Sequence, residues 1–163
     1  MNKIFFLIGL PGSGKSHWSI KQVKQHKDTV IVCRDSIRLM LRAQYANYDF
    51  NDLNMEPLTL KIAQDALRQA IKSDLNVILD ETNLTRKIRS RWIQKIREIC
   101  KYYKKPFSII FVCFDSKHHL KYRMKASRGL SKRYWSRIIT NMSVAFEPAS
   151  QKEFYHRKII VRR

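Results

Sequence analysis

A phosphate-binding pattern occupies residues 9–16, which read GLPGSGKS and are named here the phosphate loop. Its glycines let the backbone turn tightly and aim N–H groups at phosphate oxygens. Lys15 is then placed to reach the β- and γ-phosphates of a nucleoside triphosphate, and the Ser16 hydroxyl to ligate Mg²⁺. The residues that we expect to bind the nucleotide are Gly9, Pro11, Gly12, Ser13, Gly14, Lys15, Ser16 and His17.

A carboxylate directly follows the apolar run at 76–79. An acid in that position is the expected partner of the loop hydroxyl in holding magnesium, so Asp80 is predicted to act with Ser16. Glu81 is adjacent and could share or replace that role, and the sequence leaves this choice open. Thr82 and Asn83 add polar groups just past the same run.

Asp35 and Arg38 lie three residues apart after another apolar run, 29–33. On a helix this spacing places both side chains on one face. A carboxylate there can orient an acceptor hydroxyl and take its proton, while the guanidinium binds a phosphate of the same acceptor. A helix-capping aspartate beside a surface arginine has the same spacing. The residues that we expect to bind the acceptor are Arg34, Asp35, Arg38, Thr82, Asn83 and Arg86.

Apolar runs and helical patterns alternate along the chain. The runs predict strands over 3–8, 29–33, 76–79, 107–114 and, at an edge, 158–161. Helices are expected over 35–43 and from Ser131 to 146. Another follows the phosphate loop and ends near residue 25, and two more begin at Pro57 and after Thr85, which can cap its helix. We therefore expect one α/β domain over 1–163, a P-loop NTPase-type three-layer sandwich with a central parallel sheet of four to five strands. The carboxyl ends of parallel strands meet at one edge, so the phosphate loop, Asp35 and Asp80 should lie together.

Composition indicates a polyanionic partner. The formal net charge is +20, from 33 Lys and Arg against 13 acids. A protein that handles only a small nucleotide does not need so large a positive charge. A basic track on one predicted helix could follow a nucleic-acid backbone, although an amphipathic helix also needs a polar face. Its members are Arg86, Lys87, Arg89, Arg91 and Lys95.

No membrane partner is expected. No apolar run approaches membrane-spanning length, and the three cysteines show no metal-ligand spacing. We therefore predict a cytoplasmic protein, with a homo-oligomer left open.

Four segments together resemble the kinase domain of phage polynucleotide 5′-kinase and its relatives: GLPGSGKSHW, RDSIR, VILDETNLTRKIRSRW and FDSKHHLKYRMKASRG. The likeness runs from Met1 to Phe146. It implies transfer of the γ-phosphate of ATP to the 5′-hydroxyl of RNA or DNA, with Asp35 as general base and Arg38 on the 3′-phosphate of the acceptor. Asp80 falls on the acid of the D-x-T-N motif of many relatives, whereas the phage enzyme has its acid one place later, at Glu81 here.

The resemblance also implies a helical lid, over residues 117–137, with two arginines above the transferring phosphate. Arg123 and Arg128 suit that role, because guanidinium groups neutralise charge that develops in the transition state. Arg128 would also contact the nucleotide. The two lie five residues apart rather than one helical turn, so the lid helix carries a bulge or Lys125 takes part.

Three functions remain open from the sequence. The first is a polynucleotide 5′-hydroxyl kinase that uses ATP, or another nucleoside triphosphate, and Mg²⁺. The second is a small-molecule P-loop kinase that acts on a nucleoside or another alcohol. The third is an ATP-dependent nucleic-acid-binding or toxin-like module without transfer. If the chain is phage-encoded, the host cytoplasm is its expected location.

Overall fold

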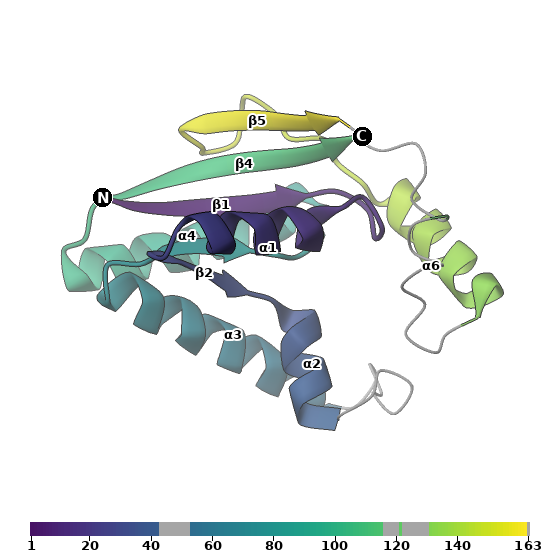
Figure 1. The fold of residues 1–163 in the computed structure, drawn as a ribbon, viewed down its shortest axis with the longest axis horizontal. Helices are drawn as coiled ribbons and strands as arrows, with labels where there is room; N and C mark the ends of the chain where they lie inside the picture. Colours follow the sequence, from purple (N-terminus) through teal and green to yellow (C-terminus); the bar gives the residue numbers. More distant parts are fainter. Residues whose placement is uncertain (43–52, 116–120, 122–130, 163) are drawn as a thin grey trace.

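The centre of the molecule is a parallel sheet, with five strands among the described residues (Figure 1). The computed structural model describes residues 1–42, 53–115, 121 and 131–162. The strand order is β2-β3-β1-β4-β5. The bounds are β1 Asn2–Ile8, β2 Thr29–Val32, β3 Asn76–Leu79, β4 Phe107–Asp115 and β5 Arg157–Arg162. The predicted strands, including the edge strand, are confirmed.

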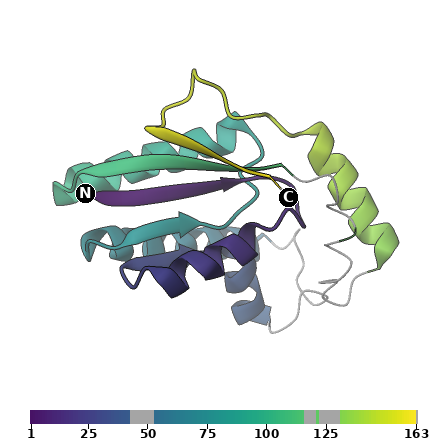
Figure 2. The same cartoon turned by 45° about the horizontal axis from the view of Figure 1, so that its top comes forward.

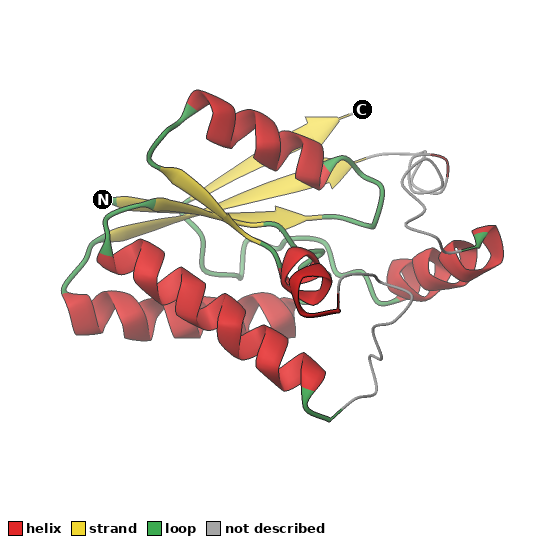
Figure 3. Cartoon of the chain, turned by 60° about the horizontal axis from the view of Figure 1, so that its bottom comes forward, coloured by secondary structure: helices red, strands yellow, loops and turns green. Residues whose placement is uncertain are grey.

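Helices cover both faces of the sheet (Figure 3). Their bounds are α1 Lys15–Gln25, α2 Arg34–Arg42, α3 Met55–Lys72, α4 Arg86–Tyr103 and α6 Lys132–Val144. Successive strand residues point to opposite faces, so Phe6 belongs to the core shared with α3 and α4. Leu7 belongs to the core on the other face, which includes Trp18 of α1. The predicted three-layer α/β sandwich is confirmed.

Two predicted helix starts depend on capping hydroxyls, and the structure contains both. The Thr85 side chain accepts a hydrogen bond from the Ile88 N–H at 3.2 Å, and Ser131 accepts one from the Tyr134 N–H at 3.2 Å. Each bond satisfies a backbone donor that has no partner within the helix. Pro57 lies in the first turn of α3, where a missing N–H costs nothing.

Helix α6 lies beyond the carboxyl ends of the strands, at the same edge of the sheet as the phosphate loop (Figures 1 and 2). The segment that leaves α6 is fastened to the loop after β3, because the Glu147 N–H donates to the Leu84 carbonyl at 2.9 Å. Most of the predicted loop at 44–54 and of the predicted lid lies outside the described residues. Within the described part of the chain, no helix is both long and apolar enough to cross a bilayer.

Candidate active site

The phosphate loop connects β1 to α1. Gly12 and Gly14 have φ angles of 84° and 94°, in the left-handed region that favours glycine. The Lys15 ammonium donates to the carbonyls of Gly9 and Leu10 at 2.9 and 2.8 Å, and the lysine is only 8% exposed. The local sequence therefore produces a compact loop whose lysine lies over its own backbone.

Close packing at Gly9 explains the first glycine of the pattern. A Cβ at this position would lie 2.9 Å from Ser13 Oγ and 3.1 Å from the Phe114 Cβ at the end of β4. The Gly9 N–H also donates to the Thr82 carbonyl at 3.1 Å. The phosphate loop thus lies against the end of β4 and the loop after β3, and a side chain at position 9 would force its neighbours to shift.

Asp80 and Glu81 diverge at the end of β3. Leu79 ends β3 in the core on the α3 and α4 face, and the chain then turns tightly, since the Glu81 N–H donates to the Leu79 carbonyl at 3.0 Å. Asp80 lies near the Ser16 hydroxyl and the Lys15 ammonium, both of which act on the pKa of its carboxyl, whereas Glu81 accepts hydrogen bonds from Arg34 Nε and Nη2 at 2.6 and 2.8 Å. Asp80, not Glu81, therefore shares its surroundings with the hydroxyl of the phosphate loop.

Burial affects the protonation of Asp80, which is 7% exposed. Loss of solvent raises the pKa of its carboxyl, while the nearby Ser16 hydroxyl and the charge of Lys15 oppose that rise. A carboxylate and a hydroxyl are hard oxygen donors of the kind that Mg²⁺ prefers. Ser16 and Asp80 together fit the predicted magnesium site.

Asp35 and Arg38, predicted to bind an acceptor, lie in the first turns of α2. Arg38 Nη1 donates to Asp35 Oδ1 at 2.7 Å, so the two side chains share a face as their spacing predicted. Arg38 Nε and Nη2 donate to the two oxygens of Glu56 at 2.7 and 3.0 Å. Glu56 belongs to the first turn of α3, and no signal in the sequence paired it with a residue 18 positions earlier. Packing of α2 on α3 brings it to the site.

Arg34, predicted to bind the acceptor, is also engaged by acids. Besides its two bonds to Glu81, its Nη1 lies 3.9 Å from Glu56 Oε2. Both arginines of α2 that were predicted to contact the acceptor therefore already contact carboxylates, and an acceptor phosphate would compete with those carboxylates.

Asn83, predicted to bind substrate, is 1% exposed and lies behind the phosphate loop. Its Nδ2 donates to the Leu7 carbonyl at 2.9 Å, and its Oδ1 has no partner among the described residues. Its φ of 46° is one that asparagine tolerates better than most residues. Asn83 thus holds the end of β1, just before the phosphate loop, whereas Thr82 is half-buried at the same edge.

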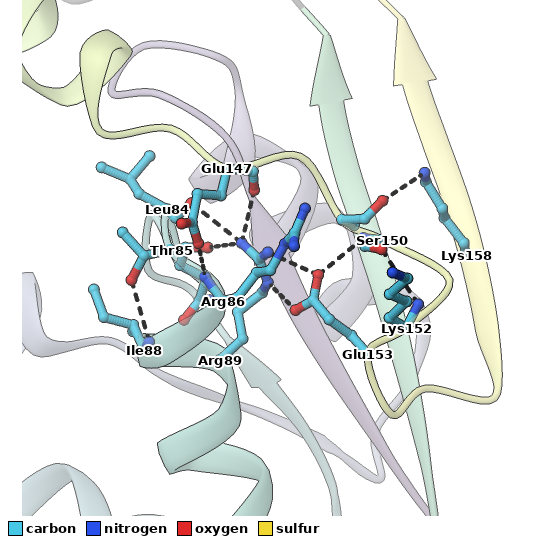
Figure 4. Close-up of polar contacts among 12 residues, drawn as sticks. Leu84, Thr85, Arg86, Ile88, Arg89, Glu147, Ser150, Lys152, Glu153 and Lys158 are labelled. Carbon is cyan, nitrogen blue, oxygen red and sulfur yellow. Dashed lines mark hydrogen bonds and ion pairs between the residues drawn. The ribbon is translucent and has the colours of Figure 1, made fainter.

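The predicted basic track on α4 is wrong for Arg89 (Figure 4). This side chain is fully buried and donates to both oxygens of Glu153, at 2.6 and 2.8 Å. Its Nη1 donates to the carbonyls of Asn83 and Glu147 at 2.8 and 3.0 Å. Arg89 therefore joins α4 to the loop after β3 and to the segment after α6, and it offers no charge to a partner. The reason is tertiary, because the acid lies 64 residues away.

Of the remaining predicted site residues, three are exposed and the lid residues lie outside the described part of the chain. Ser16 and His17 are exposed at the start of α1, and Arg86 is exposed at the start of α4. Arg123, Arg128 and Lys125 lie outside the described residues.

A family model described as an AAA domain (AAA_33) matches residues 4–129. The chain belongs to this family. The match includes the phosphate loop, the start of α2 and the loop after β3, which carry the candidate site. No curated protein matches the sequence.

The AAA domain shares its fold with solved kinases. A fungal RNA kinase has a TM-score of 0.70 at 15% identity, over 98% of this chain and 74% of that one. A chain of the Pnkp1/Rnl/Hen1 RNA repair complex has a TM-score of 0.61 at 23% identity, over 92% of this chain and 48% of that one. A gluconokinase from Sinorhizobium meliloti 1021 has a TM-score of 0.57 at 14% identity, over 99% of this chain and 82% of that one. These likenesses show the P-loop kinase fold, and the chain spans under half of the protein in the repair complex.

Proposed function

We propose that this AAA domain is a phage-type polynucleotide 5′-hydroxyl kinase, which transfers the γ-phosphate of ATP to the 5′-hydroxyl of RNA or DNA. The observation that carries the proposal is the contact between Asp35 and Arg38 at the edge that also holds the phosphate loop. The Asp35 carboxylate can accept the proton of a hydroxyl, and the Arg38 guanidinium can bind a phosphate. An acceptor that carries both groups would therefore be oriented by the two side chains.

The donor side supports phosphoryl transfer. Lys15 and the loop N–H groups would bind the triphosphate, and Ser16 and Asp80 would hold Mg²⁺. When bound, this ion neutralises charge on the β- and γ-phosphate oxygens. Arg123 and Arg128 are proposed to cover the transferring group, and His17 and Pro11 to border the nucleotide.

On the acceptor side, Asp35 would take the proton of the attacking hydroxyl and hold that oxygen in line with the γ-phosphate. Its carboxylate is 43% exposed, so an acceptor can reach it. Arg38 would hold the 3′-phosphate of the acceptor nucleotide in exchange for part of its contact with Glu56. Arg34, Thr82 and Arg86 would border the acceptor.

A small-molecule kinase is the second candidate, and one observation favours it. Arg34 and Arg38 both contact acids, so the acceptor site as folded is less cationic than its arginines suggest. An uncharged alcohol would bind without displacing a carboxylate. The net charge of +20 favours the polynucleotide, because a small alcohol gains nothing from it.

The deciding experiment is transfer of labelled γ-phosphate from ATP with magnesium to four 5′-hydroxyl acceptors: an RNA oligomer, a DNA oligomer, a nucleoside 3′-monophosphate and a free nucleoside. Asp35→Asn should lower turnover roughly 10²–10⁴-fold, as loss of a general base does, with ATP affinity unchanged. Asp65→Asn is the matched control, since Asp65 is exposed on α3 away from the site. It should leave turnover unchanged.

Each result has a clear meaning. If the oligomers are labelled and Asp35→Asn abolishes this labelling, the result would support the polynucleotide kinase. The amounts of label would show whether RNA or DNA is preferred. Label on the free nucleoside alone would support the small-molecule kinase. ATP binding without transfer to any acceptor would support a nucleotide-dependent binding module instead.

A further inference from the structure

Helix α6 has one face that no part of the proposed chemistry uses. The exposed face, named here the α6 basic face, carries three cations with hydroxyl and amide side chains between them. Its members are Lys132, Arg133, Ser136, Arg137, Thr140 and Asn141. Together they line a hollow of about 660 Å³.

The opposite side of α6 is less exposed to solvent. Trp135 is 7% exposed and is the buried residue of this helix. Tyr134, Ile138 and Met142 on the same side are half-buried. The helix is therefore amphipathic, and the α6 basic face is its solvent-exposed side.

The charge on this face is of one sign. From Lys132 to Val144 the helix contains no acidic residue, and no described carboxylate forms an ion pair with its three cations. An ordinary solvated face carries both signs, as α4 does where Lys95 lies 3.3 Å from Glu98. Three like charges close together repel one another, so their free energy falls when an anion binds.

The position of α6 suits a long acceptor. The helix lies beyond the carboxyl ends of the strands, at the edge that also holds the phosphate loop (Figures 1 and 2). The contact between Glu147 and Leu84 ties its end to the loop that carries Asp80. Arg34 and Arg38 already contact acids, so phosphates beyond the reacting nucleotide need other cations.

We infer that the α6 basic face binds the sugar–phosphate backbone of the acceptor strand, downstream of its 5′-terminal nucleotide. The inference rests on the proposed function. Guanidinium and ammonium groups contact phosphate oxygens, and the hydroxyl and amide groups supply the further donors typical of backbone contacts. Arg133 and Arg137 lie one turn, about 6 Å, apart along the helix axis and can reach neighbouring phosphates of one strand.

The test replaces all three cations of the face with glutamine, in Lys132→Gln/Arg133→Gln/Arg137→Gln. The matched control is Lys24→Gln/Lys27→Gln/Lys101→Gln, which removes the same charge from exposed positions at the end of α1, after it, and in the last turn of α4. Affinity for a labelled single-stranded oligonucleotide is measured by fluorescence anisotropy over a salt series. Turnover is measured with an oligomer and with a nucleoside 3′-monophosphate.

The α6 variant should bind the oligomer roughly tenfold or more weakly near physiological salt, and its slope of log K against log salt should fall by about 2. The KM for the oligomer should rise while kcat and turnover of the monophosphate stay as in the parent chain. The control triple should leave oligomer affinity, the salt slope, KM and kcat close to those of the parent chain.

Equal losses in both triples would overturn the inference, because they would show a general charge effect. Unchanged oligomer binding in the α6 variant, or an equal loss with the monophosphate, would overturn it too. Failure of the proposed function has a different signature: no transfer to any oligomer in the parent chain, with oligomer binding still weakened only in the α6 variant.

Discussion

Arg38 and Glu56 form a two-point ion pair, with Nε to Oε1 at 2.7 Å and Nη2 to Oε2 at 3.0 Å. A guanidinium that already faces a carboxylate on one edge and Asp35 on another is fixed in position, because rotation would break both contacts. The same geometry makes Glu56 a competitor of any phosphate that binds to Arg38.

Replacement of Glu56 tests that competition. Glu56→Gln keeps the shape of the side chain and removes its charge, so acceptors with a 3′-phosphate should bind about fivefold more tightly, the equivalent of about 1 kcal/mol for a partly exposed pair. Acceptors without that phosphate should be unaffected. Steady-state KM values for the two acceptor types measure the difference. A higher KM with the phosphate would show instead that Glu56 orients Arg38.

Asp80→Asn should raise stability and abolish activity. Burial raises the pKa of Asp80, so its ionised form at neutral pH opposes folding, and this cost is absent below the pKa of the unfolded chain. The asparagine should therefore be roughly 0.5–2 kcal/mol more stable at pH 7. Thermal unfolding without nucleotide, beside magnesium-dependent turnover, checks both effects. A less stable variant that keeps its turnover would contradict the assignment of Asp80.

Glu153→Gln should destabilise the fold in a pH-dependent way. Burial raises the pKa of Glu153, but hydrogen bonds and charge from Arg89 outweigh that effect and lower it. Stability from the pair is therefore present above the pKa of the unfolded chain and is lost as pH falls through the folded value. At pH 7 the variant leaves the Arg89 charge buried and should cost roughly 3–5 kcal/mol.

Denaturant unfolding of parent and variant from pH 7 down to pH 3 measures this difference, which should shrink in acid. Glu98→Gln serves as control, because Glu98 forms an ion pair with Lys95 at the surface and its side chain is 54% exposed. It should change stability by no more than about 1 kcal/mol at any pH. A constant difference for Glu153→Gln across the range would show that ionisation of the pair is irrelevant.

Gly9→Ala should displace the phosphate loop. The added Cβ would lie 2.9 Å from Ser13 Oγ and 3.1 Å from the Phe114 Cβ, and overpacking of this kind costs roughly 1–3 kcal/mol. ATP affinity, measured by calorimetric titration, should fall about tenfold or more. The unfolding midpoint, measured alongside, separates a local shift from loss of the fold. Unchanged affinity would mean that the loop can move without harm to the nucleotide site.

Features that depend on adjacent residues could be predicted from the sequence. The phosphate loop needs its glycines at fixed spacing, and Gly12 and Gly14 have the positive φ angles that this implies. Thr85 and Ser131 cap their helices through bonds to residues three positions later. Apolar runs of strand length located the sheet, and alternation of strands and helices predicted its parallel order. Each of these is governed by local backbone geometry.

Features that depend on which elements pack together required the structure. The resemblance left Asp80 and Glu81 as alternatives, and only the structure separates them, because Glu81 pairs with Arg34 of α2 whereas Asp80 lies near Ser16 and Lys15. Arg89 has the sequence context of a surface cation, yet it is the fully buried partner of Glu153. Glu56 reaches Arg38 because α3 packs on α2. An ion pair between distant residues depends on the path of the whole chain, and a charged residue looks the same in the sequence whether water or a buried carboxylate surrounds it.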